Sequence, residues 1–163
     1  MTKFLLLLSV ITSLFAEVGT LKKIIDGDTL HFTYDKCRLL YIDTPESKRN
    51  SKAQRDTDSC NALTLDTMVK MGKQSTTHAQ ELLTVGKQYK YDVIGHDRYQ
   101  RALCVVYTPN GILNELMVKD GYAVAFDKYL PNEAKRKYHL LEQDAKSNNR
   151  GLWKYSNIDC LGN

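Results

Sequence analysis

The feature that most constrains the fold is a closely spaced set of strand and turn signals near the start of the chain. Two runs rich in β-branched and aromatic residues, 20–25 and 29–34, flank D-G-D, the first three residues of the sequence D-G-D-T that begins at Asp26. Such runs joined by Asp-Gly are typical of two strands connected by a tight turn. Residues 38–42 predict a third strand, which Pro45 ends because proline cannot donate to a strand ladder. The stretch therefore predicts a sheet of short strands.

The same stretch carries side chains suited to hydrolysis. Asp28, Asp43 and Glu46 are carboxylates that could share a hard cation or activate water, and Arg38 could hold a phosphate. Strict alternation along a strand would place Arg38 and Asp43 on opposite faces. They converge only if the chain turns or bulges near Asp43. An Asp-Gly turn alone is most often only a hairpin turn, so a functional interpretation depends on the whole set.

The first residues have the layout of a signal peptide. Lys3 supplies a cationic start, residues 4–15 form an apolar run, and Ala16 is a small residue where cleavage is expected. The run is shorter than the roughly 20 residues that a membrane-spanning helix needs. We therefore expect residues 1–16 to be a signal peptide, the protein to be secreted or periplasmic, and no stable membrane span. A buried N-terminal helix is the alternative.

The rest of the chain, residues 17–163, has the length of one ordinary domain. None of its four cysteines forms a C-x-x-C pair of the kind found in zinc sites. An even number in an exported chain indicates disulfides, with buried free thiols as the alternative. Four cysteines allow three pairings, and spacing does not choose among them. Because Cys37 and Cys104 lie in apparent strands, we favour their pairing, which leaves Cys60 with Cys160.

A charged segment follows the early strands. Residues 47–58 are polar and lack a hydrophobic period, which predicts an exposed loop or insertion. Helical spacing appears in residues 62–71 and 77–85, with Gly72 as the stop between them. We place a charged loop and helix insertion at about residues 47–75. The formal net charge of +4 is too small to indicate a nucleic-acid partner by itself, so the location of the charges matters.

The second half of the chain predicts a hairpin and more helix. Residues 87–94 and 102–107 alternate like strands, and the connection between them carries Arg98, Tyr99 and Arg101. The expected helices are residues 112–119 and a helix that has Asn132 as its N-cap and runs to residue 149. Five short strands with about three flanking helices indicate an α+β fold with a mainly β core. The leading candidate is a five-stranded oligonucleotide/oligosaccharide-binding (OB) barrel.

Several motifs occur together in a characteristic order. They are D-G-D-T, R-L-L-Y-I-D-T-P-E, D-R-Y-Q-R, and K-Y-L-P-N followed by a helix that ends in G-L-W. In these motifs, over about residues 20–155, the chain resembles the staphylococcal nuclease family. Two departures are visible. The segment after Glu46 is longer and contains Cys60, and Asp127 stands where an aromatic residue is expected shortly before Tyr129.

The resemblance implies a secreted, calcium-dependent nuclease that hydrolyses phosphodiester bonds of DNA and RNA and leaves 3′-phosphates. It matches Asp28, Asp43 and the main-chain carbonyl of Thr44 to the Ca²⁺ ligands of the family. Hard oxygen ligands suit calcium, but they also suit magnesium, so the identity of the metal rests on the resemblance.

The resemblance also implies roles for the remaining site residues. Glu46 matches the general base for the attacking water. Arg38 and Arg101 match the pair that grips the scissile phosphate through planar guanidinium groups. The weaker substrate-binding candidates are Arg98, Tyr99 and Tyr129, together with a cluster of Lys48, Arg49 and Lys52 for further phosphates. For the tyrosines, core packing is the alternative.

Two other functions remain open at this point. One is a nucleic-acid-binding barrel without catalysis, and the other is an exported barrel that binds peptides or sugars. Domains that have lost catalysis tend to lose the carboxylates or arginines, whereas all of them are present here. We therefore expect an enzyme that acts as a monomer and has no protein partner.

Overall fold

The computed structural model describes residues 16–60, 63–155 and 158–161. The expected signal peptide, residues 1–16, lies outside this part of the chain except for Ala16. Among the described residues, no helix combines the length and the apolar character that crossing a membrane requires.

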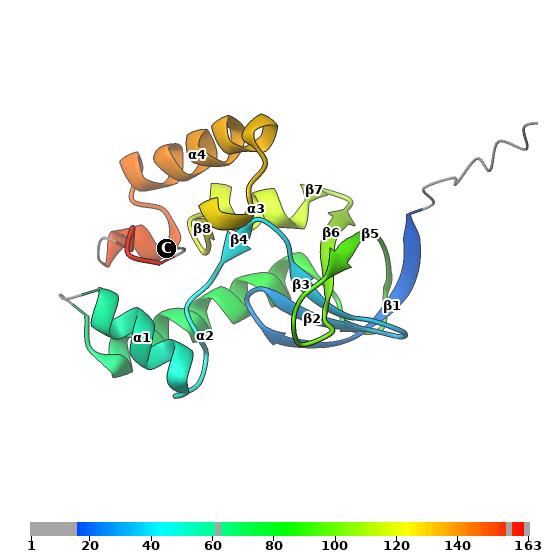
Figure 1. Ribbon diagram of the computed structural model, residues 1–163, viewed down its shortest axis with the longest axis horizontal. Helices are drawn as coiled ribbons and strands as arrows, with labels where there is room; N and C mark the ends of the chain where they lie inside the picture. Colours follow the sequence, from blue (N-terminus) through cyan, green and yellow to red (C-terminus); the bar gives the residue numbers. More distant parts are fainter. Residues whose placement is uncertain (1–15, 61–62, 156–157, 162–163) are drawn as a thin grey trace, which may run out of the picture.

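Five strands form a closed barrel, which confirms the predicted α+β fold with an OB-type core (Figure 1). They are β1 Glu17–Asp26, β2 Thr29–Phe32, β3 Lys36–Leu39, β5 Gln88–His96 and β6 Ala102–Thr108, and the short β7 Gly111–Ile112 pairs beyond β6. The strands pair in the order β3-β2-β1-β5-β6, and a parallel pairing of β3 with β6 closes the ring. The alternation predicted for residues 102–107 is visible in β6, where Ala102, Cys104 and Val106 are buried and the residues between them are half-buried.

The strand predicted over residues 38–42 is interrupted. β3 ends at Leu39, and Tyr41 adopts a φ of 72°, a left-handed conformation that ends an extended run. The chain then forms β4 Ile42–Asp43, which pairs with β8 Val124–Ala125 instead of continuing in the barrel. The turn that the sequence left open near Asp43 is therefore present.

A buried amide holds this turn to the barrel. Asn114 lies in α3 Leu113–Lys119 and is completely buried. Its side chain donates to the carbonyl of Leu40 at 2.9 Å and to that of Cys104 at 3.0 Å, and it accepts from the N–H of Val106 at 3.1 Å. Since buried polar groups that keep their hydrogen bonds fix one local geometry, Asn114 positions the segment that leads into Asp43.

Four α-helices lie to one side of the barrel in the described part of the chain, where about three were expected (Figure 1). They are α1 Ser51–Ser59, α2 Leu65–Leu82, α3 and α4 Asn132–Ser147, with 3-10 turns η1 Asp127–Tyr129 and η2 Gly151–Lys154. The additional helix is α1, which lies in the segment predicted as a loop. Asn50 caps it by accepting from the N–H of Ala53 at 2.8 Å, and Ala53 is its only buried residue. One buried alanine gives no hydrophobic period, so only the N-cap residue type signals this helix.

One helix replaces the two that were predicted over residues 62–71 and 77–85. α2 runs without a break through Gly72, so the predicted stop there is wrong. Gly72 is buried against the main chain of Glu46, and a Cβ on it would lie 2.2 Å from the Glu46 carbonyl oxygen. The glycine therefore permits the close approach of a helix to a loop, and it does not end a helix.

The long C-terminal helix also differs at its ends from the prediction. Pro131 occupies the N-cap position, α4 begins at Asn132, and the helix ends at Ser147 instead of residue 149. Tyr138 and Ala145 are buried in different hydrophobic clusters, and Leu141 is partly buried against the first of them. α4 therefore joins two parts of the interior.

The two hydrophobic clusters each contain one disulfide. The larger cluster fills the barrel and includes the Cys37–Cys104 disulfide. The second includes buried residues of α2, α4 and η2 together with the Cys60–Cys160 disulfide. Both disulfides follow the pairing favoured from the sequence. The second one ties Cys60, the C-cap of α1, to the C-terminal segment.

Candidate active site

The residues singled out from the sequence lie at one seam of the barrel, where the turn before β2, strand β3 and the start of β6 meet. Thr29 pairs with Arg38 across β2 and β3. Cys37 pairs with Ala102 across the parallel closure of the barrel. Arg101 directly precedes that pair and therefore reaches the same end of the barrel. Closure of the barrel thus gathers residues that are far apart in the sequence.

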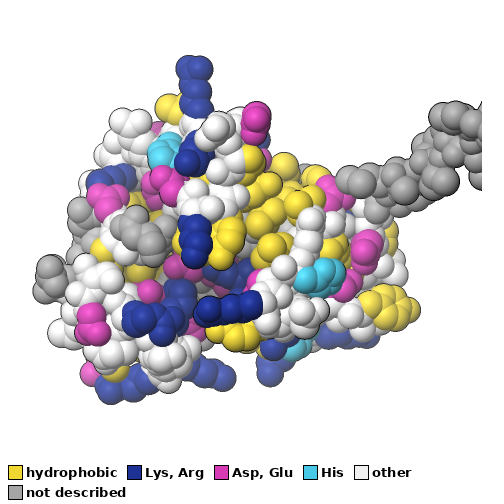
Figure 2. Space-filling view, viewed as in Figure 1, with side chains coloured by type: hydrophobic (Ala, Val, Ile, Leu, Met, Phe, Trp, Pro, Cys, Tyr) yellow, Lys and Arg dark blue, Asp and Glu magenta, His cyan; other side chains and the backbone are white. Residues whose placement is uncertain are grey.

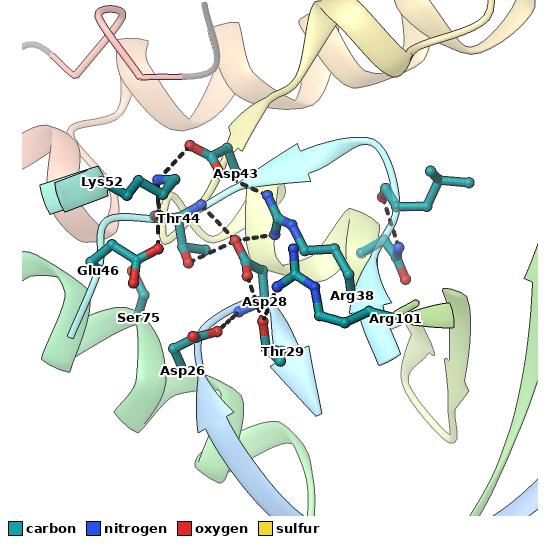
Figure 3. A network of polar contacts seen from close by, with 12 residues as sticks. Asp26, Asp28, Thr29, Arg38, Asp43, Thr44, Glu46, Lys52, Ser75 and Arg101 are labelled. Carbon is teal, nitrogen blue, oxygen red and sulfur yellow. Dashed lines mark hydrogen bonds and ion pairs between the residues drawn. The ribbon is translucent and has the colours of Figure 1, made fainter. Parts of the chain in front are cut away.

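A buried network of charges forms the centre of this seam (Figure 3). Asp28 and Asp43 are only 6% and 3% exposed, and both pair with Arg38. The Nη2 group of Arg38 donates to Oδ1 of Asp43 at 2.7 Å. The N–H and the hydroxyl of Thr44 each donate to Oδ2 of Asp28 at 3.1 Å. Burial acts to raise the pKa of Asp28, but the charges of Arg38 and Lys52 hold it below its usual value. This carboxylate is therefore ionised at neutral pH.

Asp26 adds a further carboxyl that the sequence did not single out. Its Oδ1 accepts from the N–H of Asp28 at 3.2 Å, and its side chain lines the same cleft as the seam. Burial raises the pKa of Asp26 to about 7, and the neighbouring charges of Asp28 and Glu46 act in the same direction.

Glu46 is positioned by contacts with the helices α1 and α2. It is half-buried and follows Pro45, and its Oε2 accepts from Nδ2 of Asn50 at 2.7 Å. Asn50 is also the N-cap of α1, and Gly72 of α2 lies against the Glu46 main chain. The position of this carboxylate therefore depends on α1 and α2.

Gly27 brings α2 against the other turn of the site. A Cβ on Gly27 would lie 2.7 Å from Cβ of Ser75 in α2 and 3.1 Å from the side chain of Thr44. Two glycines, Gly27 and Gly72, thus let α2 contact both turns that carry the carboxylates.

Lys52 projects from α1 into the carboxylates (Figure 3). Its Nζ lies 3.0 Å from Oδ2 of Asp43 and 3.2 Å from the carbonyl oxygen of Thr44. The distance is 3.9 Å to Oε1 of Glu46 and 2.7 Å to Oδ2 of Asp56. These charges raise the pKa of Lys52, although burial acts against that shift, so the group is an ammonium ion.

The structure separates the predicted basic cluster. Lys48 is exposed, and Arg49 pairs with Asp66 of α2, whereas Lys52 turns inward. Sequence analysis placed all three as outer phosphate contacts. It missed the inward contacts of Lys52 because helix α1, which directs them, was not recognised.

Arg101 is fixed by the turn of its own hairpin. Its Nε donates to Oδ2 of Asp97 at 2.7 Å, and Oδ1 of Asp97 accepts from the N–H groups of Tyr99 and Arg101. The Nη1 group lies 3.5 Å from the hydroxyl of Thr29. Burial acts to raise the pKa of Asp97, but its hydrogen bonds with Arg101 hold it below the usual value. One edge of the guanidinium group is thus anchored while the other faces the seam.

A cleft of about 880 Å³ opens over the seam. Asp28, Arg38, Asp43, Glu46 and Arg101 all line it. Figure 2 shows Lys and Arg side chains gathered across the middle and lower part of this face, with Asp and Glu side chains between them. We call the basic residues at the edge of the cleft, Lys36, Arg55, Arg98 and Lys128, the basic rim. These positive charges favour an anionic ligand, although the net charge of the chain is small.

The weaker substrate-binding candidates line the same cleft. Tyr99 is 65% exposed and Tyr129 is 51% exposed, so the core-packing alternative does not apply to either ring. The guanidinium carbon of Arg98 lies 4.8 Å from the Tyr99 ring centre. Phe126, which was not predicted from the sequence, also lines the cleft. Its ring packs edge-to-face with the ring of Tyr129, and the two ring centres are 4.9 Å apart. It supplies an aromatic ring one position before Asp127.

Carboxylate and carbonyl oxygens lie close together in this site, as cation binding requires. Among the described residues, no three His, Cys, Asp or Glu side chains form a metal-binding group. The set expected from the sequence has a different composition, with Asp28, Asp43 and one main-chain carbonyl. Two of its members, Asp43 and Thr44, already hold an ammonium ion within 3.2 Å. Hard oxygen donors arranged around one positive charge fit a calcium ion or a similar cation.

Comparisons with known proteins agree with this geometry. A family profile described as "Staphylococcal nuclease homologue" matches residues 36–155. Endonuclease YncB of Bacillus subtilis (strain 168) is 32% identical over 144 residues, which are 84% of this chain and 62% of that protein. The SPbeta prophage-derived endonuclease YokF of the same organism is 32% identical over 141 residues, 82% of this chain and 43% of that protein. An uncharacterized endonuclease of Escherichia coli O157:H7 is 28% identical over 140 residues, 83% of this chain and 76% of that protein. The chain thus spans less than two thirds of the length of the two Bacillus proteins.

Proposed function

The chain belongs to the staphylococcal nuclease family, and we propose that it is a secreted, calcium-dependent nuclease that hydrolyses phosphodiester bonds of DNA and RNA. The observation that carries this proposal is the convergence of two arginines and three carboxylates in one cleft. The printed names of several relatives, which are endonucleases, support cleavage within a nucleic-acid chain.

The residues that would hold calcium are Asp28, Asp43 and the carbonyl of Thr44. When bound, the ion would neutralise charge that develops on the phosphate group and would help to position the attacking water. The chemistry of the donors supports this assignment, since two carboxylates and a main-chain carbonyl are the hard oxygen ligands that Ca²⁺ prefers.

Arg38 and Arg101 would bind the scissile phosphate. Each has a planar guanidinium group with several N–H donors, which matches the paired oxygens of a phosphodiester. Arg101 is anchored through Nε to Asp97, and this leaves its outer nitrogens directed along the seam. The contacts would strengthen as charge grows on the phosphate oxygens, and this differential binding lowers the barrier.

Glu46 would orient the attacking water and accept its proton. Its carboxylate lies at the edge of the cation-binding oxygens, 3.9 Å from the Lys52 ammonium. The hydrogen bond from Asn50 fixes one of its oxygens and leaves the other toward the site. A general base needs such a position within reach of the proton that it accepts.

Exposed aromatic rings would bind the bases of the substrate. Tyr99 and Tyr129 lie on the cleft, and stacking on such rings tolerates every base. Arg98, beside Tyr99, would contact a neighbouring phosphate. A single-stranded or frayed substrate presents unstacked bases to these rings, so we expect it to be preferred. Products with 3′-phosphates are expected from the family.

Export is part of the proposal. Two disulfides are typical of proteins that fold outside the reducing cytoplasm. Together with the leader-like residues 1–16, they support a secreted or periplasmic location.

The test is cleavage of single-stranded DNA by the purified protein in calcium, in excess chelator, and by a Glu46→Gln variant. We expect cleavage that requires calcium and falls by about 10²–10⁴-fold in the variant, the usual range for a general base. A folded wild-type protein that binds DNA in a salt-sensitive manner without cleaving it would instead indicate a non-catalytic nucleic-acid-binding barrel.

A further inference from the structure

The Lys52 ammonium stands where the proposed function places a divalent cation. Its nitrogen is within 3.2 Å of Oδ2 of Asp43 and of the Thr44 carbonyl oxygen, and it is 3.9 Å from Glu46. The Lys52 side chain is 28% exposed, so it is enclosed by the site and does not extend into solvent as the basic rim does. A lysine in this position occupies oxygen atoms that a divalent cation would need as ligands.

We infer that Lys52 is a built-in competitor for the divalent cation: the cation binds only when the ammonium leaves Asp43 and the Thr44 carbonyl. This inference rests on the proposed function, because it takes these two groups as cation ligands. An ammonium and a metal ion cannot share the same two oxygens at bonding distance without strong repulsion. The affinity for the cation therefore includes the cost of displacing Lys52.

The displaced ammonium already has a second partner on its own helix. Asp56 lies one turn further along α1, and its Oδ2 is 2.7 Å from the Lys52 nitrogen. Lysine has a flexible four-carbon side chain, so rotation can break the contacts with Asp43 and Thr44 while it keeps Asp56. The exchange requires no movement of α1, which the Cys60–Cys160 disulfide holds at its end.

Competition predicts two effects of opposite sign when Lys52 is replaced. Without the cation, loss of the ammonium leaves buried Asp43 with Arg38 as its remaining ion-pair partner among the described residues, so the protein should unfold at a lower temperature. With the cation, the ion compensates Asp43, and it should bind more tightly because nothing has to be displaced. A lysine with a purely structural role would lower stability in both conditions.

The experiment compares the wild type with Lys52→Met and Lys48→Met by calorimetric titration of Ca²⁺ and by thermal unfolding in chelator and in Ca²⁺. Lys48 is an exposed lysine of the same segment, so its replacement controls for the loss of one positive charge. We expect Lys52→Met to bind Ca²⁺ about tenfold more tightly or better, as removal of a charged hydrogen-bond competitor implies. Its unfolding temperature should fall in chelator and rise more on addition of Ca²⁺ than that of the wild type.

The possible failures are distinguishable. If the wild type binds Ca²⁺ and Lys52→Met binds no more tightly than Lys48→Met, the competition is overturned while the proposed function stands. If neither the wild type nor Lys52→Met binds Ca²⁺, the calcium site of the proposed function fails and the inference fails with it. If Lys52→Met loses cleavage without any gain in Ca²⁺ affinity, Lys52 acts on the substrate and the competition is again overturned.

A second pair of variants tests the alternative partner. In the cation-free protein both Asp43 and Asp56 pair with the ammonium, whereas after displacement Asp56 would be its remaining carboxylate partner among the described residues, so Asp56→Asn should weaken Ca²⁺ binding by about threefold or more. Asp58→Asn removes an exposed carboxylate of the same helix, one that accepts from Gln54, and controls for the lost negative charge. Equal affinities of these two variants would contradict the role given to Asp56.

Discussion

The cleft has a barrel side, formed by the turn before β2, strand β3 and the start of β6, and a helical side, formed by the Glu46 loop and α1. The two sides hold their charged groups in different ways. On the barrel side, Asp28 is 6% exposed and is fixed by two donors of Thr44 and by Arg38. On the helical side, Glu46 is half-buried and takes one hydrogen bond from Asn50, and Lys52 divides its contacts among several oxygens.

This difference separates two requirements of one site. The groups that would meet the metal and the phosphate are set by strand pairing and burial, which leave them one arrangement. The groups that would handle water and regulate the cation are carried by a loop and a short helix, whose side chains can exchange partners. We therefore expect replacement of buried barrel-side charges to change folding and activity together, and replacement of the Glu46 side chain to change activity alone.

The largest combined effect on stability and cleavage is expected for Arg38→Met. The change leaves buried Asp28 and Asp43 without the guanidinium they share, which should cost about 3–5 kcal/mol of unfolding free energy. Cleavage should fall by about 10²–10³-fold, because a donor to the reacting phosphate is lost. Urea unfolding and initial rates measure the two effects, with Arg136→Met on the exposed face of α4 as the control.

The helical side offers the matching variant. Glu46→Gln should lose cleavage while its unfolding free energy stays within about 0.5 kcal/mol of the wild type, as for a partly exposed side chain. A large loss of stability in Glu46→Gln would remove the proposed contrast between the two sides.

The two disulfides allow the next comparison. Their sequence separations of 67 and 100 residues predict similar chain-entropy contributions, about 4.4 and about 4.7 kcal/mol. Cys37 and Cys104 are completely buried in the barrel, so replacing both by alanine should add a cavity cost. We expect this pair to lower the unfolding free energy more than the Cys60→Ala/Cys160→Ala pair does. Urea unfolding of both double variants gives the order, and the reverse order would mean that loop length outweighs packing.

A smaller effect is expected for Gly72→Ala. Its Cβ would lie 2.2 Å from the Glu46 carbonyl oxygen, a main-chain atom that cannot rotate away. We expect a loss of about 1–3 kcal/mol from overpacking and slower cleavage, because the Glu46 loop must shift. Gly95→Ala is the control, since nothing lies within 4 Å of a Cβ at that position. Unchanged cleavage in Gly72→Ala would show that α2 does not position Glu46.

These variants also mark the limit of what the sequence predicted. The barrel strands followed from local signals such as alternation and D-G-D-T, which act within a few residues, and the disulfide pairing was favoured only because Cys37 and Cys104 lie in two of those strands. Gly72 was misjudged because a helix stop and a close approach use the same residue type, and only tertiary packing distinguishes them. α1 was missed because its burial rests on Ala53 alone. The contacts of Lys52 depend on α1, so they were beyond prediction for the same reason.

The smallest effect concerns the link between α4 and the β4–β8 pair. Glu142 is half-buried and accepts from the N–H of Ala125 in β8 at 2.9 Å. Burial raises the pKa of Glu142 above its ordinary value of 4.5, so the folded state holds this proton more strongly than the unfolded state. The contribution of Glu142 to stability is therefore present below pH 4.5 and is lost as the pH rises through the folded pKa.

Glu142→Gln keeps an oxygen for the Ala125 N–H and removes the titration. Relative to the wild type, its unfolding free energy should rise with pH over that window, by about 1 kcal/mol or less, the size usual for one partly buried group. Glu133→Gln, an exposed change on the same helix, should show a flat difference. Urea unfolding at several pH values measures both, and equal slopes for the two variants would show that folding does not raise the pKa of Glu142.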